Sequence, residues 1–251
     1  MAEQKNYEPC FTDVPDDWHG RWTLLREFIR RWYGIPVGNV GEPSALVAEE
    51  EAKLGQSLPP SFREWISLCE QLLARDAFDI LRDCYEVVRL KDHAAISLLI
   101  QGEADVYWAV KEENLNLDDP PVDWYPIDYE AEGEPFIHAG ELAPHITSFV
   151  LGQLAYYLQG NGGSALVSVK LTDAFLAQMH TAFPIASRFD HLRIFEKENM
   201  FALIKPDQHD PTDYDLLVQI WQPIPLSQVP ECILKNLHHG GAFSGMLVPE
   251  S

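Results

Sequence analysis

Basic residues are scarce in this chain of 251 residues, and that scarcity argues against several classes of partner. Lysine and arginine number 18 against 39 aspartates and glutamates, so the formal net charge is −21 with the histidines neutral. A field of this sign repels nucleic acid and anionic lipid, and it attracts basic proteins. We therefore expect a protein partner, with no nucleic acid and no membrane.

Long apolar runs and cysteine pairs are missing as well. No stretch approaches the roughly 20 apolar residues that cross a bilayer, and the first residues lack the apolar run of a secretory signal. The four cysteines, which include no Cys-x-x-Cys pair, are Cys10, Cys69, Cys84 and Cys232. Without a secretory route, free thiols in a reducing compartment are expected, and the predicted location is the cytoplasm.

Motifs for catalysis, metal binding or cofactor binding are also lacking. There is no Gly-Lys-Ser/Thr phosphate loop, and the glycines of 160–163 follow a predicted helix and open a strand, which is the wrong order for a dinucleotide site. The nine histidines form no His-x-x-x-His pair. A serine nucleophile needs glycine two residues earlier, but Ala242 stands there before Ser244. We expect that the protein is not an enzyme and that it has no catalytic residue, no metal and no cofactor.

Apolar periodicity predicts the helices and strands that are present. Helices are expected from Trp18 until Gly34, over 44–54 with Ser44 as N-cap, from 60 to about 73, over 144–158, after Thr172, and after Pro225. Strands are expected over 85–90, 94–100, 105–111, 165–170, 192–195, 201–204 and 214–221, with a loop or edge segment over 118–135. This order favours the α+β class, with a mostly antiparallel sheet flanked by helices and with helices at the N-terminus.

The expected division of the chain has three parts. A polar, poorly ordered lead-in covers 1–17, a single α+β domain with an N-terminal helical extension covers 18–237, and a tail covers 238–251. The first helix carries four arginines opposite its apolar stripe, at Arg21, Arg26, Arg30 and Arg31. We interpret them as partners of the protein's own carboxylates, because charges on a helix face usually serve no ligand.

Carboxylates are concentrated between Glu103 and Glu134, where 11 acidic residues stand against a single lysine, Lys111. Aromatic residues are interleaved with them. The candidate partner-binding residues are Tyr107, Trp108, Asp118, Asp119, Asp123, Trp124, Tyr125 and Asp128. In one interpretation the acids steer a partner and the aromatics anchor it. In the other, the aromatics complete the core and the acids face water.

Two further interpretations of these acids are less favoured. A catalytic carboxylate pair needs two groups held in a cleft with separated pKa values, which spacing in a loop does not establish. A calcium loop needs alternating Asp or Asn with a glycine at its sharp turn, and the Asp118–Asp123 stretch has neither.

A more specific pattern stands at Glu51-Ala-Lys-Leu54-Gly55-Gln-Ser-Leu58-Pro59-Pro-Ser-Phe62-Arg-Glu-Trp65. Gly55 suits the C-cap of one helix, the following prolines suit the start of the next, and Phe62 and Trp65 would enter the core. This stretch resembles the N-terminal signature of the SUKH superfamily. The residues of this chain that match the signature have structural roles in the family. They are Glu51, Leu54, Gly55, Leu58, Pro59, Phe62 and Trp65.

A second stretch is similar to the same family. The segment Asp119-Pro120-Pro121-Val122 follows the predicted strand that holds Trp108, and a helix comes next, as in many bacterial members. The third helix continues through Cys69, where members commonly turn at Asn-Gly. The resemblance is specific over 47–65, fair as far as Val122 and loose beyond. It implies a SUKH-like α+β fold and a protein that binds without catalysing.

The resemblance also implies a biological role. Bacterial members are mostly immunity proteins that neutralise polymorphic toxins, many of which act on nucleic acid. An acidic protein that covers a basic toxin domain competes with the phosphate backbone. We therefore expect an immunity protein that neutralises a cognate, basic toxin domain. A regulatory adaptor with an endogenous protein partner is the alternative, and a hydrolase with a carboxylate or serine site ranks third.

Overall fold

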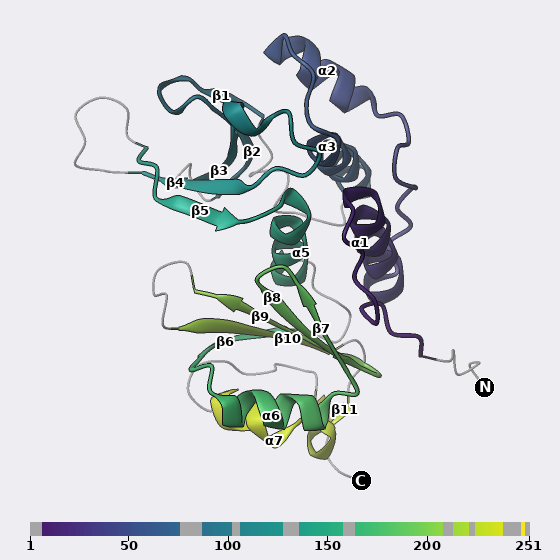
Figure 1. Ribbon diagram of the computed structural model, residues 1–251. Helices are drawn as coiled ribbons and strands as arrows, with labels where there is room; N and C mark the ends of the chain where they lie inside the picture. Colours follow the sequence, from purple (N-terminus) through teal and green to yellow (C-terminus); the bar gives the residue numbers. More distant parts are fainter. Residues whose placement is uncertain are drawn as a thin grey trace. The chain divides into compact units, whose positions relative to one another are not determined.

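The computed structural model describes residues 7–75, 87–101, 106–127, 136–157, 164–207, 213–220, 224–237 and 247–248 (Figure 1). It contains two five-stranded antiparallel sheets with helices, so the predicted α+β class is confirmed. The chain groups into two compact units. Unit 1 comprises Met1–Pro15, Arg31–Gly34 and Leu158–Ser251, and unit 2 comprises Asp16–Arg30 and Ile35–Tyr157.

Unit 2 is built around the sheet with strand order β1-β2-β3-β4-β5. Its elements are α1 (Trp18–Tyr33), α2 (Ala45–Leu54), α3 (Pro60–Leu73), β1 (Arg89–Leu90), η1 (Lys91–His93), β2 (Ala95–Gln101), β3 (Val106–Lys111), η2 (Glu112–Asn114), β4 (Val122–Pro126), β5 (Gly140–Ala143) and α5 (Ile146–Tyr157). The end of α1, from Arg31, belongs to unit 1. On one face of the sheet, the Trp65 indole of α3 donates a hydrogen bond to the Leu98 carbonyl (2.9 Å), and Trp108 contacts Phe149 of α5.

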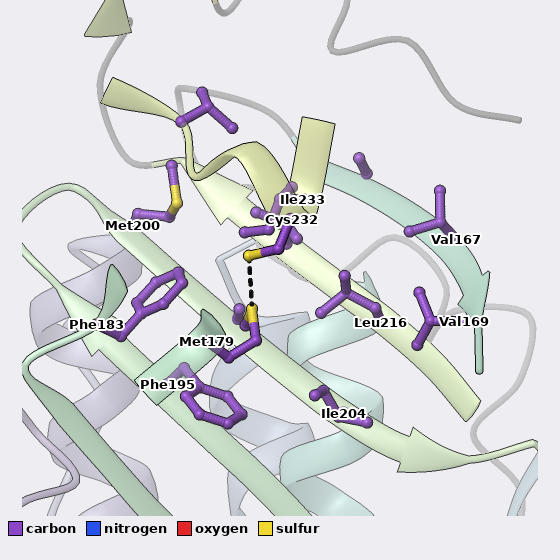
Figure 2. Packing of buried hydrophobic residues seen from close by; sticks show 14 of the residues in the cluster. Val167, Val169, Met179, Phe183, Phe195, Met200, Ile204, Leu216, Cys232 and Ile233 are labelled. Carbon is purple, nitrogen blue, oxygen red and sulfur yellow. Dashed lines mark hydrogen bonds between the residues drawn. The ribbon is translucent and has the colours of Figure 1, made fainter. Parts of the chain in front are cut away.

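Unit 1 is built around the sheet with strand order β6-β10-β9-β8-β7. Its elements are β6 (Ser164–Val169), α6 (Asp173–Ala182), β7 (Ile185–Phe189), β8 (Leu192–Lys197), β9 (Met200–Pro206), β10 (Tyr214–Ile220), β11 (Ile224–Pro225), η3 (Leu226–Gln228), α7 (Glu231–Leu237) and β12 (Leu247–Val248). Figure 1 shows α6 and α7 on one face of this sheet. In Figure 2, Met179 of α6 and Cys232 of α7 point toward each other, and they belong to the same buried cluster as Ile204 and Leu216.

Local signals in the sequence place the helix ends correctly. The Ser44 hydroxyl accepts a hydrogen bond from the Val47 N–H, and the Thr172 hydroxyl accepts one from the Phe175 N–H, so both predicted N-caps are confirmed. Gly55 ends α2 with φ of 71°, a left-handed conformation that glycine adopts without strain. The side-chain oxygens of Ser44 and Thr172 therefore determine where α2 and α6 begin, and Gly55 determines where α2 ends.

Two predictions about local order are wrong. The stretch expected to be loop or edge contains β4, which lies between β3 and β5 and pairs with both. Buried Val122 and Tyr125 hold this strand in place, although an acid and a proline gave its sequence a loop-like composition. The lead-in was expected to be poorly ordered, yet Cys10 and Phe11 are buried in unit 1.

A buried carboxylate explains the ordered lead-in. Glu196 of β8 is fully buried, and its oxygens accept hydrogen bonds from the N–H groups of Cys10 (2.8 Å) and Phe11 (3.0 Å). The Trp32 indole donates a third, at 3.0 Å. A buried charge needs such donors, so these contacts fix the start of unit 1 on its sheet. The division into 1–17, 18–237 and 238–251 stays a prediction, although residues 247–248 of the expected tail form β12.

Arg26, Arg30 and Arg31 of α1 pair with the protein's own carboxylates, as interpreted from the sequence, and Arg21 hydrogen-bonds to Nδ1 of His145 (3.0 Å). Arg30 lies 3.6 Å from Glu27, and Arg31 lies 3.6 Å from Glu8. Arg21 is buried as well, and only 1% of the area of Arg26 is exposed. Its guanidinium donates to Glu64 at 2.7 Å, and the second oxygen of Glu64 accepts from the Gly41 N–H at 2.7 Å. A charge predicted to face solvent therefore lies in the core of unit 2.

Breaking the Arg26–Glu64 pair should destabilise the protein strongly. Glu64→Gln leaves a buried guanidinium without its counter-ion, and we expect a loss of about 3–5 kcal/mol in the free energy of unfolding. The double variant Arg26→Met/Glu64→Leu removes both charges and should recover most of that loss. Urea unfolding measures both. A double variant no more stable than Glu64→Gln would contradict this account of the pair.

Candidate functional site

The acidic residues predicted to bind a partner begin in the connection between β3 and β4. We name residues 112–118 the acidic connection. Glu113, Asn116, Leu117 and Asp118 are exposed there, and 44% of the Leu117 side chain is open to solvent. An exposed leucine flanked by acids combines apolar contact area with negative charge, the two properties that a surface for a basic protein needs.

The backbone of the acidic connection is held at several points. The Glu112 N–H donates to the Ala94 carbonyl (2.7 Å), and the Leu117 N–H donates to the Asn114 carbonyl (3.0 Å). The Glu112 carboxylate also pairs with Arg89 at 2.9 Å. Because this backbone is fixed before any partner arrives, binding through its side chains costs less conformational entropy.

Asp119 serves the start of a helix instead of the surface. One carboxylate oxygen accepts from the Thr147 N–H (3.2 Å) and the other from the Thr147 hydroxyl (2.6 Å), in the first turn of α5. The Ser61 hydroxyl of α3 hydrogen-bonds to the same carboxylate. Burial raises the pKa of Asp119, and these hydrogen bonds oppose the rise without cancelling it. Asp119 therefore has a structural role at the α5 N-terminus.

Asp123 is also withdrawn from the surface. It lies on β4 with 2% of its area exposed. Its Oδ1 lies 3.2 Å from Nζ of Lys111 and 2.7 Å from Nε2 of His138. A carboxylate with these two partners joins β3 and β4 to the segment before β5, and it offers little charge to a partner.

The predicted aromatic anchors divide in the same way. Trp108 (3% exposed) and Tyr125 (1% exposed) lie inside, so for these two the core interpretation holds, and a buried ring cannot anchor a partner. The ring of Tyr125 contacts the rings of His93 and His138, with centroids 4.9 and 5.2 Å away. Burial, followed by the charge of Asp123, raises the pKa of Tyr125 to about 12.

The rest of the predicted set is more accessible. Tyr107 and Trp124 are half-buried, and Tyr107 packs edge-on against Phe136 with 4.6 Å between ring centroids. Register pairs Tyr107 with Tyr125 and Trp108 with Trp124, so adjacent pairs point to opposite faces of the sheet. Asp128 lies outside the described residues. Partner binding by Tyr107, Asp118 and Trp124 stays a prediction.

Exposed apolar residues were missed by sequence reasoning. Leu117 and Ile137 expose 44% and 48% of their area, on the acidic connection and just before β5. The only local signal for Leu117 is its position between polar Asn116 and Asp118, which breaks any helix or strand period. No comparable signal marks Ile137, because its exposure depends on how the chain approaches β5.

The residues of the family-like motif lie where their physical roles predict. Leu58 is 4% exposed, and Phe62 and Trp65 are fully buried. Pro59 is the N-cap of α3, with Pro60 as its first residue. Glu51 has an unforeseen role, since its carboxylate accepts from the Leu58 N–H (2.8 Å) and from Arg63 (2.7 Å). Leu54 is half-buried at the end of α2. These contacts give the α2–α3 turn its shape.

Neither a metal centre nor a membrane span is found in the part of the chain that the structure describes. No group of three His, Cys, Asp or Glu side chains there is arranged to hold a metal ion. No helix in the same ranges is long and apolar enough to cross a membrane. Comparisons with protein-family models, with curated proteins and with solved structures give no match to this chain.

The role of Asp119 predicts different results for two substitutions. Asp119→Ala removes the acceptors for Thr147 and should cost about 1 kcal/mol in the free energy of unfolding. Asp119→Asn keeps an acceptor for the N–H and should be tolerated. Because the folded-state pKa of Asp119 is raised, the part of its stabilisation that depends on protonation is fully present below pH about 4 and is lost as the pH rises through the folded-state pKa.

Urea titrations of the wild type and both variants across this pH interval measure the effect. Asp119→Asn should gain stability relative to the wild type as the pH rises, because asparagine does not ionise. A constant difference between them at every pH would show that Asp119 has no raised pKa.

Proposed function

We propose that this chain is a non-enzymatic, cytoplasmic binding protein, and specifically an immunity protein that neutralises a basic toxin domain. The observation that carries the proposal is the acidic connection, where Leu117 is exposed between the acids Glu113 and Asp118 on a fixed backbone. The net charge of −21 supports the same partner chemistry. The resemblance of 47–65 to the SUKH signature supports the immunity role.

The physical basis of neutralisation would be competition. A toxin that acts on nucleic acid presents a basic surface to phosphates. Exposed carboxylates attract that surface over a distance of about 8 Å at physiological salt, and a central apolar side chain gives the complex its lifetime. In this arrangement the carboxylates of Glu113 and Asp118 set the association rate, and Leu117 sets the dissociation rate.

An adaptor that binds an endogenous protein is the alternative, and growth separates the two roles. The test takes any basic toxin domain that the gene neighbourhood encodes and produces it with and without the chain. Immunity requires that the chain restores growth and forms a stable complex with that domain. An adaptor would leave the toxin active.

The carboxylates of the acidic connection should control association. Glu113→Gln/Asp118→Asn removes two exposed charges, and we expect association with the toxin domain to slow about two- to fivefold at low salt. The difference should shrink at high salt, where charges are screened. Stopped-flow fluorescence measures the rates. Glu49→Gln, on exposed α2, is the control and should change little.

Leu117→Ala should act on dissociation. We expect dissociation to become about fivefold faster, which corresponds to about 1 kcal/mol, with association nearly unchanged. If both variants bind with wild-type rates at low salt, the acidic connection is not the interface. Asp119 and Asp123 are unsuitable for this test, because their substitution disturbs contacts inside unit 2.

A further inference from the structure

Unit 2 contains a hollow of about 480 Å³ that is separate from the acidic connection. It lies between the first residue of α1, the start of α2 and the N-terminal half of α3. Its apolar lining comes mainly from Trp18, Pro43, Val47, Ala48 and Pro60. The volume falls within the range of about 300–1,000 Å³ that ligand-binding pockets occupy. We name this hollow the α2–α3 groove.

The polar groups inside the α2–α3 groove already have partners. The Ser44 hydroxyl accepts from the Val47 N–H (3.2 Å) and donates to Glu70 (2.5 Å). The Glu64 carboxylate is taken by Arg26 and by the Gly41 N–H. Polar groups that already have hydrogen-bond partners contribute little to the binding of a new ligand. A ligand would therefore contact mainly the apolar lining of the groove.

The rim of the groove carries a carboxylate, Glu42, that has no counter-ion among the residues that the structure describes. Glu42 is exposed, and its Oε1 accepts a hydrogen bond from the Asn39 N–H at 2.8 Å. A Cβ at Gly38 would collide with this carboxylate, so the glycine leaves the space that Glu42 occupies. Lining residue Glu51 is paired with Arg63, whereas no ion pair within the described ranges neutralises Glu42. The rim therefore holds a fixed negative charge beside an apolar hollow.

We propose that the α2–α3 groove binds a short segment of a protein partner in which an apolar side chain stands next to a lysine or arginine. The apolar side chain lies against Pro43, Val47 and Pro60, and the cation pairs with Glu42. Half-buried Trp18 offers its ring to the same cation. An acidic segment would meet both Glu42 and the net charge of −21. This inference rests on the proposed binding function and adds a second contact region to it.

Capped hexapeptides test the groove without the partner. The probe is Ac-Gly-Ser-Leu-Arg-Ser-Gly-NH2, and its controls replace Arg by Glu or Leu by Ser. The indole N–H signal of Trp18, assigned with Trp18→Phe, is followed by NMR during titration. We expect a saturable shift with the Leu-Arg peptide, and binding about three- to fivefold weaker with the Leu-Glu peptide. The peptide in which serine replaces leucine should show no saturable shift.

Two variants with matched controls locate the binding. Ala48→Arg places a long side chain in the groove from an exposed position of α2, whereas Ala52→Arg changes a residue that is also exposed on α2 but does not line the groove. The first should abolish peptide binding and the second should preserve it. Glu42→Gln keeps the acceptor for Asn39 and should weaken the Leu-Arg peptide about threefold. The control Glu49→Gln should have no effect.

The outcomes separate this inference from the proposed function. The proposal that the groove binds a peptide is overturned if Ala48→Arg and Ala52→Arg bind the peptide equally. It is also overturned if the Trp18 signal shows no saturable shift at millimolar peptide. In either case, a complex between the wild-type protein and the toxin domain would still support the proposed function. If the peptide binds as expected but no neighbouring toxin domain is bound or neutralised, the immunity function fails and the groove remains.

Discussion

The first turns of helices need hydrogen-bond acceptors, and unit 2 depends on how three consecutive residues supply them. The Asp118 carbonyl accepts from the Ser61 N–H of α3 (3.0 Å), and the Pro120 carbonyl accepts from the Ile146 N–H of α5 (2.9 Å). Between them, Asp119 accepts from Thr147 of α5. N–H groups at helix starts have no partner within the helix. This short stretch therefore positions α3 and α5 and, through Val122, the start of β4.

The same stretch explains why acidic residues close together in the sequence differ in function. Asp118 is exposed, Asp119 caps a helix, and Asp123 is buried with Lys111 and His138. The charge that a partner meets is therefore smaller than the acidic count between Glu103 and Glu134 indicates. Among the described residues, specificity then depends on where exposed acids such as Asp118 stand beside apolar side chains such as Leu117, because position sets register and total charge does not.

Local features could be predicted from the sequence, and features that depend on distant partners could not. Ser44, Gly55 and Thr172 determine helix ends through neighbouring backbone groups, so their roles follow from a few adjacent letters. Arg26 and Asp123 are buried because Glu64 and His138 reach them across the fold. Among the described candidate residues, Asp118 is exposed and Tyr107 and Trp124 are half-buried, whereas Trp108 and Tyr125 are buried, since strand pairing decides which face each aromatic takes.

The buried carboxylate of Glu196 has a consequence for the beginning of the chain. Its hydrogen-bond donors include the backbone N–H groups of Cys10 and Phe11, which side-chain substitution, other than by proline, leaves in place. The main chain at positions 10 and 11 therefore has a role of its own, in addition to the buried side chains of Cys10 and Phe11. Removing the residues before the first helix would take the Cys10 and Phe11 N–H donors away from a carboxylate that is buried inside unit 1. The segment around Cys10 and Phe11 is therefore part of the core of unit 1, where it packs against β8.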